Sequence, residues 1–218
     1  MQGLSSKSFI SFLSGILLVS LWGCLQKPPT IHTVEESTLA TEDKTLQACK
    51  LCHSNREMQR GPVLDGMEEW YLLDQLQKFK TGLRGQQDSN RAEILMATAM
   101  KDVSPDPETL LSLAQAFATL PPQPSLTTIK GNAERGQQLY QSCANCHGVD
   151  AKGNPEVKAP GLLIQEDWFL LDQLRKYKLG LRGTHPEDSF GTVMAAAVKD
   201  WPDKDLKDIV VYLNSLTP

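Results

Sequence analysis

The sequence predicts an all-α protein built from two similar small domains, and three observations lead to this prediction. Residues 70–85 (WYLLDQLQKFKTGLRG) and 168–183 (WFLLDQLRKYKLGLRG) are identical at twelve of sixteen positions with an offset of 98, so the chain is an internal duplication. Apolar side chains recur at helical spacing in both halves. No segment alternates between apolar and polar residues, so no strand pattern competes with the helices.

The helices of the second half follow from apolar stripes and end signals. One helix is expected to begin with Asp167 as its cap and to end near Gly180. Its apolar face, at the spacing i, i+4, i+7 and i+11, consists of Leu170, Leu174, Tyr177 and Leu181. A second helix over 132–143 leads into a pair of cysteines, and a last helix follows Asp203. The stripe of the last helix consists of Leu206, Ile209, Val210 and Leu213.

The first half repeats this pattern and ends with a helix of its own. The apolar stripe of that helix consists of Leu110, Leu113, Ala114 and Phe117. Each half has only about 85 residues, which is small for a self-sufficient core.

The segments between and before the helices divide the chain into five parts. Residues 122–131, rich in Pro and polar residues, are expected to link a first domain at 38–121 to a second at 132–218. Residues 24–37 have the composition of a flexible tether, and residues 1–23 that of an export signal.

The expected signal has a single charge, Lys7, before an apolar run at 9–22 that is short for a membrane span. The run ends in LWGC, which resembles the lipobox of bacterial lipoproteins and would make Cys24 the lipidated first residue. A plain uncleaved anchor and an ordinary signal peptide are the alternatives. The sequence therefore predicts an exported protein on the periplasmic side of a bacterial membrane, lipid-anchored at Cys24.

Composition and charge exclude two other classes of protein. The chain has 218 residues, and its hydrophobic content of 40% is ordinary for a globular protein rather than a disordered one. The net charge of −4 includes no basic patch, so no nucleic-acid partner is expected.

Two Cys-x-x-Cys-His units carry the chemistry, at 49–53 (CKLCH) and 143–147 (CANCH). A thiol–disulfide switch would give the histidine no role. A four-cysteine zinc site would have to join pairs 94 residues apart in separate repeats. Covalent haem attachment accounts for every residue, since two thioethers form on one helical turn and the adjacent histidine binds iron. The predicted attachment residues are Cys49, Cys52, Cys143 and Cys146, and the predicted iron ligands are His53 and His147.

With these motifs the chain resembles the dihaem class I cytochromes c of bacterial respiratory chains, from about Glu36 to Leu216. The resemblance rests on LYQSCANCHG, on the AP that follows it, on WFLLDQLRKYKLGLRG and on a methionine before the last helix. Residues 168–194 also look like the dihaem segments attached to membrane oxidases. The resemblance implies two tandem class I cytochrome c domains, each wrapped around one covalently bound haem c.

The sixth iron ligand is expected to be Met194 in the second half and Met96 in the first, because the offset of 98 pairs them. The alternative in the second half is His185, whose equivalent, Gln87, cannot replace it.

Three other methionines compete with Met96 in the first half. Met100 is next in order, but its equivalent is Val198, so it is expected to pack. Met67 and Met58 lie outside the matched segments.

A ligating histidine usually donates its second N–H to a carbonyl or a carboxylate. In the family that the chain resembles, the backbone carbonyl of a proline shortly after the haem motif accepts it, and Pro62 and Pro160 match that place; loop stiffening is the alternative. The lysines of KFK and KYK are candidates to reach haem propionates or a partner, and a solvated helix face is the alternative.

The resemblance implies an electron carrier rather than an enzyme, since a sulfur ligand raises the haem potential and closes the iron to small molecules. The expected partners are a donor of the quinol–cytochrome c reductase type and a terminal oxidase or reductase as acceptor. Two alternatives remain: a dihaem oxidoreductase acting on peroxide or a sulfur anion, and an electron-transfer subunit of a larger oxidase or dehydrogenase complex.

Overall fold

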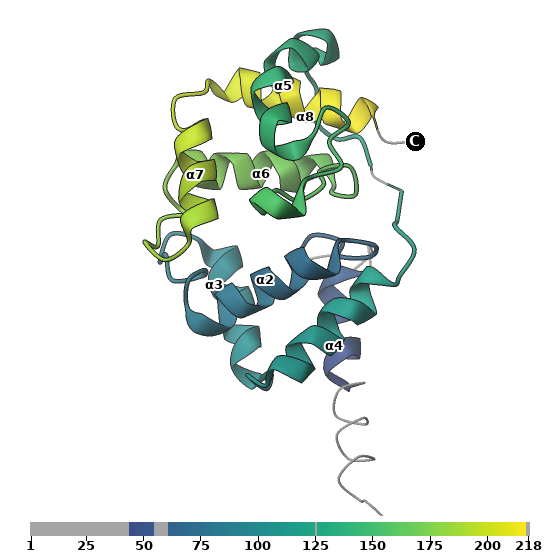
Figure 1. The fold of residues 1–218 in the computed structure, drawn as a ribbon, viewed down its shortest axis with the longest axis vertical. Coiled ribbons are helices and arrows are strands. Elements are labelled where there is room, and N and C mark those ends of the chain that lie inside the picture. The colour runs from purple at the N-terminus through teal and green to yellow at the C-terminus, as the bar shows by residue number, and fades with distance from the viewer. Residues whose placement is uncertain (1–43, 55–60, 125, 217–218) are drawn as a thin grey trace, which may run out of the picture.

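The computed structural model describes residues 44–54, 61–124 and 126–216, which fold almost entirely into helices (Figure 1). Within these ranges there is no strand, only an isolated antiparallel bridge between Asn154 and Ala159. The all-α prediction is confirmed. The predicted signal, the tether with Cys24, and Met58 lie outside the described residues.

Among the residues described, each half contains four α-helical segments in the same order, whereas the short 3₁₀ helices occupy different places. In the first half these are the helical segment 44–53, α2 (Glu69–Thr81), α3 (Arg91–Ala99), η1 (Met100–Asp102) and α4 (Pro107–Ala118). In the second half they are α5 (Ala133–His147), η2 (Pro155–Val157), α6 (Asp167–Lys178), α7 (Ser189–Val198) and α8 (Asp203–Ser215).

The last helix of each half packs as its sequence predicts. All four stripe residues of α4 and all four of α8 are buried. The four residues of the stripe predicted for α6 are only half-buried. The buried apolar residue of this helix is Leu171, which lies outside the stripe and packs on Leu206 and Val210 of α8. A single apolar face fails to describe α6 because the helix contacts both α7 and α8 as well as the first half.

Asp167 does not cap α6, contrary to the sequence prediction. Glu166 occupies the N-cap position, and Asp167 is the first residue of the helix. The Asp167 carboxylate accepts hydrogen bonds from the backbone N–H groups of Thr128 at 2.5 Å and Ile129 at 2.7 Å. The carboxylate thus binds N–H groups of the linker, whereas a capping residue would bind the first N–H groups of its own helix. The buried Asp167 therefore attaches the linker to the second half.

Helices α5 and α8 cross at close range. A Cβ atom at Gly136 would lie 1.9 Å from the backbone oxygen of Asp208, so this crossing requires glycine. The buried Asp208 carboxylate accepts from Asn132 N at 2.8 Å and from Arg135 Nη1 at 2.8 Å. Burial raises the pKa of Asp208, but these donors and Lys204 outweigh it and lower the pKa to about 2.

The two halves lie one above the other, with α2 and α6 near the boundary between them and α4 and α8 farther away (Figure 1). The linker after α4 runs along one side of the molecule to reach α5. Among the helices of the described ranges, none has the length and apolar character needed to cross a bilayer.

Candidate haem-attachment sites

The second candidate site lies at the C-terminal end of α5. Cys143, Cys146 and His147 occupy its last turn, and the His147 side chain is buried. His147 Nδ1 lies 2.9 Å from the backbone oxygen of Pro160. A carbonyl oxygen only accepts hydrogen bonds, so Nδ1 carries the proton and Nε2 keeps its lone pair for a metal.

The first candidate site repeats this geometry at the end of the helical segment 44–53. His53 Nδ1 lies 2.8 Å from the backbone oxygen of Pro62, so the same tautomer is fixed. Gly61 passes directly over the ring, because a Cβ there would lie 2.6 Å from His53 Cε1. The loop can therefore reach the histidine only with glycine at this position.

Both imidazoles are held in the neutral form that a metal ligand needs. Burial lowers the pKa of His53 and of His147 below the ordinary value. The hydrogen bonds to the two prolines oppose this, as do the charges of Asp65 near His53 and Glu68 near His147, without reversing it.

The four cysteines of the two motifs are free thiols in the structure. Burial raises the pKa of Cys49 and of Cys143, which makes these thiols poor nucleophiles for disulfide exchange. In the described ranges no three residues among His, Cys, Asp and Glu gather into a metal-binding cluster. Two thiols on one turn beside a neutral imidazole are a donor set that fits a covalently bound haem.

The paired methionines occupy equivalent places in the two halves. Met96 lies in α3 and Met194 in α7, and both side chains are half-buried. At the next paired position Met100 and Val198 are buried, at 2% and 6% exposure. Met100 packs in the core of the first half beside Phe79, as expected from the pairing.

The other candidates for the sixth position make different contacts. Met67 is buried, and its Sδ accepts from Gln165 Nε2 of the second half at 2.6 Å. His185 Nδ1 accepts from the backbone N–H of Glu187 at 3.2 Å.

The last lysine of each KFK or KYK triplet bonds backbone carbonyls, a role that the sequence did not indicate. Lys80 Nζ donates to Met100 O at 2.7 Å, to Lys101 O at 3.3 Å and to Val103 O. Lys178 Nζ donates to Trp201 O, the equivalent of Val103. Each lysine therefore holds the segment that follows the methionine-bearing helix.

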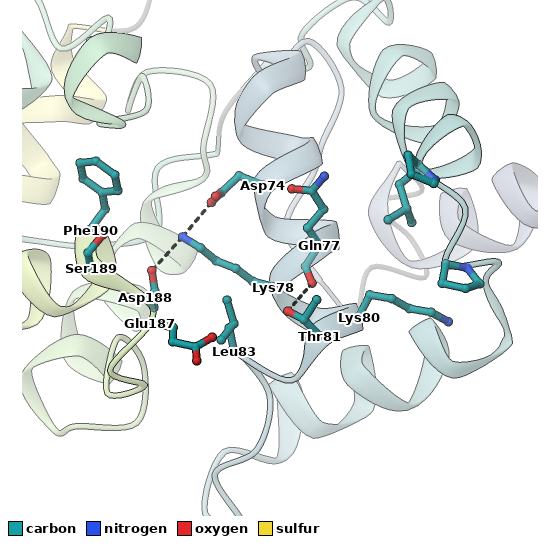
Figure 2. Close-up of a pocket in the computed structure, with 13 residues that line it drawn as sticks. Asp74, Gln77, Lys78, Lys80, Thr81, Leu83, Glu187, Asp188, Ser189 and Phe190 are labelled. Carbon is teal, nitrogen blue, oxygen red and sulfur yellow. Dashed lines mark hydrogen bonds and ion pairs between the residues drawn. The ribbon is translucent and has the colours of Figure 1, made fainter.

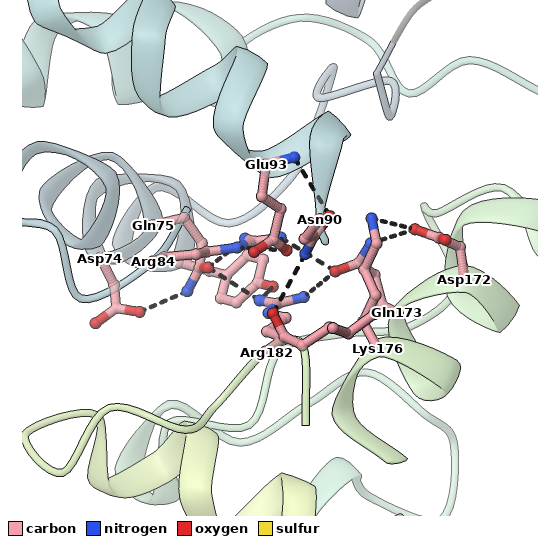
Figure 3. A network of polar contacts seen from close by, with 11 residues as sticks. Asp74, Gln75, Arg84, Asn90, Glu93, Asp172, Gln173, Lys176 and Arg182 are labelled. Atoms are coloured by element: carbon pink, nitrogen blue, oxygen red, sulfur yellow. Dashed lines mark hydrogen bonds and ion pairs between the residues drawn. The ribbon is translucent and has the colours of Figure 1, made fainter. Parts of the chain in front are cut away.

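A ring of four polar side chains, two buried and two half-buried, joins the two halves, and Figure 3 shows its members converging from both sides. Arg84 donates to Gln75 of its own half at 2.6 Å and to Gln173 of the other half at 3.1 Å. Arg182 likewise donates to Gln173 at 2.7 Å and to Gln75 at 2.9 Å. Because the glutamines and the arginines are paired by the offset of 98, the ring has approximate two-fold symmetry. We call these four residues the Arg–Gln ring.

Glu93 breaks the symmetry of the Arg–Gln ring. Its buried carboxylate binds Arg84, with an Oε1–Nη2 distance of 2.6 Å, and the equivalent position in the second half is Gly191. Burial raises the pKa of Glu93, but Arg84, and to a smaller degree Arg182 and Lys176, outweigh it and leave the pKa below its ordinary value.

Lys78 makes an ionic link between the halves, at the side of a cavity of about 670 Å³ (Figure 2). Its Nζ lies 2.8 Å from Asp74 of its own helix and 2.9 Å from Asp188 of the second half. The equivalent Lys176 forms an ion pair within α6, with Asp172, the equivalent of Asp74, at 2.7 Å. The lining of this cavity includes none of the predicted haem-attachment cysteines or iron ligands.

Comparison with known proteins finds similarity to c-type cytochromes. Residues 133–217 match the family model for cytochrome c. A cytochrome c4 from Azotobacter vinelandii is 28% identical over 180 residues, covering 77% of this chain and 84% of that protein. The FixP subunit of a cbb3-type cytochrome c oxidase from Sinorhizobium medicae is 46% identical over 114 residues, covering 49% of this chain and 32% of FixP.

Two solved structures share the fold. The cytochrome c4 of Acidithiobacillus ferrooxidans superimposes with a TM-score of 0.62 at 24% identity, covering 78% of this chain and 98% of that one. Thiosulfate dehydrogenase TsdBA from Marichromatium purpuratum superimposes with a TM-score of 0.57 at 21% identity, covering 71% of this chain but only 32% of that one.

The fold is thus that of two tandem class I cytochrome c domains, as the resemblance of the sequence implied. The family of the matching model implies covalently bound haem c. Together the matches support a c-type cytochrome in electron transfer, similar to the cytochromes c4.

Proposed function

We propose that the chain is a dihaem c-type cytochrome that carries electrons in a respiratory chain at a membrane surface. One observation carries the proposal: the two Cys-x-x-Cys-His units present their histidines in the same way. His53 and His147 each have Nδ1 bound to a proline oxygen, at 2.8 and 2.9 Å. Two domains built alike at this point are suited to the same cofactor.

Each residue of the motif then has a defined task. Cys49 and Cys52 in the first half, and Cys143 and Cys146 in the second, would hold one haem c each through thioethers. When bound, haem c supplies reversible one-electron exchange at its iron. Pro62 and Pro160 fix the tautomer and the orientation of the histidine rings. The proposed domains, 38–121 and 132–218 joined by 122–131, each enclose one such site.

The proposed sixth ligands are Met96 and Met194. Both lie in helices whose following segment is held by a lysine, Lys80 or Lys178. A thioether ligand closes the iron to small molecules, which favours a carrier over an enzyme. The oxidoreductase alternative requires one exchangeable iron site, and carbon monoxide binding tests for it.

The proposal also includes the redox partners of the protein. We expect a donor of the quinol–cytochrome c reductase type and a terminal oxidase or reductase as acceptor. The match to FixP favours a second form of the same function, in which the chain is the electron-transfer subunit of an oxidase. Copurification from detergent extracts separates a bound subunit from a free carrier.

Lipidation of Cys24 would place the protein on the periplasmic side of its membrane. A Cys24→Ala variant whose signal is still cleaved should leave the membrane fraction, because stable anchoring requires the acyl chains that the cysteine carries. An intact Met1 in the mature protein would exclude this anchor.

The central experiment counts haems. After expression with a periplasmic haem-attachment system, denatured protein should carry two covalent haem adducts by mass spectrometry. One adduct or none would overturn the proposal. In the reduced native protein, stoichiometric binding of carbon monoxide at one haem would contradict the carrier function for that haem and support the oxidoreductase alternative.

A further inference from the structure

Two loops that fix the iron-binding histidines meet at the boundary between the halves. We call them the histidine loops: residues 61–68, which contain Pro62, and residues 159–166, which contain Pro160. In each loop the residue directly after the proline bonds with a side chain of the other half. Gln165 Nε2 donates to Val63 O at 3.1 Å, and the backbone N–H of Gly161 donates to Glu68 Oε1 at 2.7 Å.

These two cross-contacts differ in charge. Gln165 brings a neutral amide to the first histidine loop, whereas Glu68 brings a carboxylate to the second. Glu68 lies close enough for its charge to act on the His147 ring. The carboxylate that acts on His53 is Asp65, which belongs to the first half itself.

The position of the Glu68 carboxylate has a cost. Its second oxygen, Oε2, is buried and has no hydrogen-bond partner among the described residues. A buried acceptor without a partner destabilises a protein by about 1–3 kcal/mol, more when it is charged. Packing alone would be better served by an apolar or amide side chain.

Glycine at position 161 makes the approach possible. A Cβ atom there would lie 2.7 Å from Glu68 Oε1 and 3.0 Å from the backbone oxygen of Lys152. Val63, the equivalent residue of the first half, has a side chain at this place, and its backbone oxygen accepts from the neutral Gln165 amide. The missing side chain of Gly161 therefore lets a carboxylate reach the backbone of the second histidine loop.

We propose that Glu68, a residue of the first half, is a positioning and tuning residue for the haem of the second half, whose reduction potential it lowers through its contact with Gly161. This inference rests on the proposed attachment of haem at Cys143 and Cys146. Ferric iron carries one more positive charge than ferrous iron, so a nearby carboxylate favours the oxidised form. The effect crosses the boundary between the halves, because Glu68 belongs to the first half and Gly161 to the second.

Glu68→Gln isolates the charge, because the amide oxygen can still accept from Gly161 N–H. We expect the equilibrium constant for reducing the second haem to rise about tenfold, the size of one charge at roughly 10 Å in a medium of effective dielectric constant near 20. For a one-electron couple tenfold corresponds to 59 mV. Glu69→Gln is the matched control, since it removes the same charge from an exposed neighbouring residue, and should change either constant less than about twofold.

Gly161→Ala provides a second test that leaves the charge in the protein. The added methyl group would displace the flexible end of Glu68, so the potential of the second haem should rise in the same direction as with Glu68→Gln. In the Glu68→Gln background the Gly161→Ala change should add little.

The readout is a redox titration of the holoprotein, with each haem assigned by NMR contacts between its methyl groups and protein protons of one half. A rise confined to the haem at Cys143 and Cys146 supports the inference. Haem present at those cysteines with an unchanged potential, or a shift at the haem of the first half, overturns it. Absence of haem from Cys143 and Cys146 by mass spectrometry would overturn the proposed function as well, so the two failures are distinguishable.

Discussion

The two halves of the molecule are alike where they hold their proposed cofactors and different where they touch each other. The His–Pro pairs and the carbonyl-binding lysines recur in both halves. At the boundary, by contrast, equivalent positions carry different residues. Glu93 of the first half corresponds to Gly191 of the second, and Asp188 of the second half corresponds to the neutral Asn90 of the first. Asp188 consequently attracts Lys78 across the boundary, whereas Asn90 donates to Leu181 O at 3.3 Å.

This difference shows how a duplicated protein acquires two unequal sites. Changing residues around the iron would alter the ligands themselves. Changing charges at the boundary would alter the reduction potential of each proposed haem and leave its ligands in place. The following experiments compare equivalent residues of the two halves, from the largest expected effect to the smallest.

Exchanging the proposed sulfur ligands should give the largest effect. Met194→His should lower the potential of the second haem by roughly 0.2–0.4 V, within the ~0.8 V that axial ligands span, and leave the first haem nearly unchanged. Met96→His should do the reverse. Redox titrations check both variants.

Met96→Ala should open the first iron to carbon monoxide, and Met100→Leu is its control because the buried Met100 can be replaced at similar volume. Carbon monoxide binding by the Met100 variant instead of the Met96 variant would show that the first half has been paired incorrectly with the second.

Removing one arginine of the Arg–Gln ring should destabilise the contact between the halves. Arg84→Ala should cost about 3–5 kcal/mol, because it leaves the buried Glu93 carboxylate without its ion pair. Arg182→Ala should cost less, since no carboxylate lies at the equivalent place. Denaturant unfolding measures both, and the double variant Arg84→Ala/Glu93→Gln should recover part of the loss. Equal costs for the two arginines would contradict the asymmetry assigned to Glu93.

Lys80→Gln and Lys178→Gln compare the two carbonyl-binding lysines. Lys80 bonds three carbonyl oxygens and Lys178 bonds Trp201 O, so the first variant should lose more stability, about 1.5–3 kcal/mol. Each variant should also increase carbon monoxide binding in its own half only, because the segment after the methionine helix is released. Increased carbon monoxide binding in the opposite half would show that the lysine does not support the methionine ligand of its own half.

The smallest expected effect concerns pH. The pKa of Glu93 in the folded protein lies below its ordinary value of 4.5, so its ion pair contributes stability that is present above about pH 4.5 and is lost as pH falls through the lower folded pKa. Glu93→Gln should remove this part of the acid destabilisation, while the exposed control Glu69→Gln should retain it. Stability curves measured between pH 2 and pH 7 that remain parallel for the parent and the Glu93 variant would refute this role.

The sequence predicted the features that depend on local patterns. Cysteine spacing located the candidate sites, and the stripes of α4 and α8 were complete because each of these helices buries a single face. Asp167 was assigned wrongly because its partners come from the linker, 38 and 39 residues away in sequence.

The boundary between the halves could not be predicted from helical periodicity, because its contacts join residues about 90–110 positions apart. A signal was nevertheless present. Gln75 and Arg84 are unchanged at the equivalent positions 173 and 182, although their polar side chains contribute nothing to an apolar stripe. Polar residues retained in both copies of a repeat point to a contact made by both copies.

The Arg–Gln ring also has a consequence for the origin of the chain. Arg84 reaches Gln173 as Arg182 reaches Gln75, which is the reciprocal relation found in an isologous dimer. A half-length chain with one glutamine and one arginine at these places would keep one bond within each copy and form two bonds between two copies. Gene duplication then turns a concentration-dependent association into a permanent one, and only after that step can the two partners of a symmetric pair diverge independently.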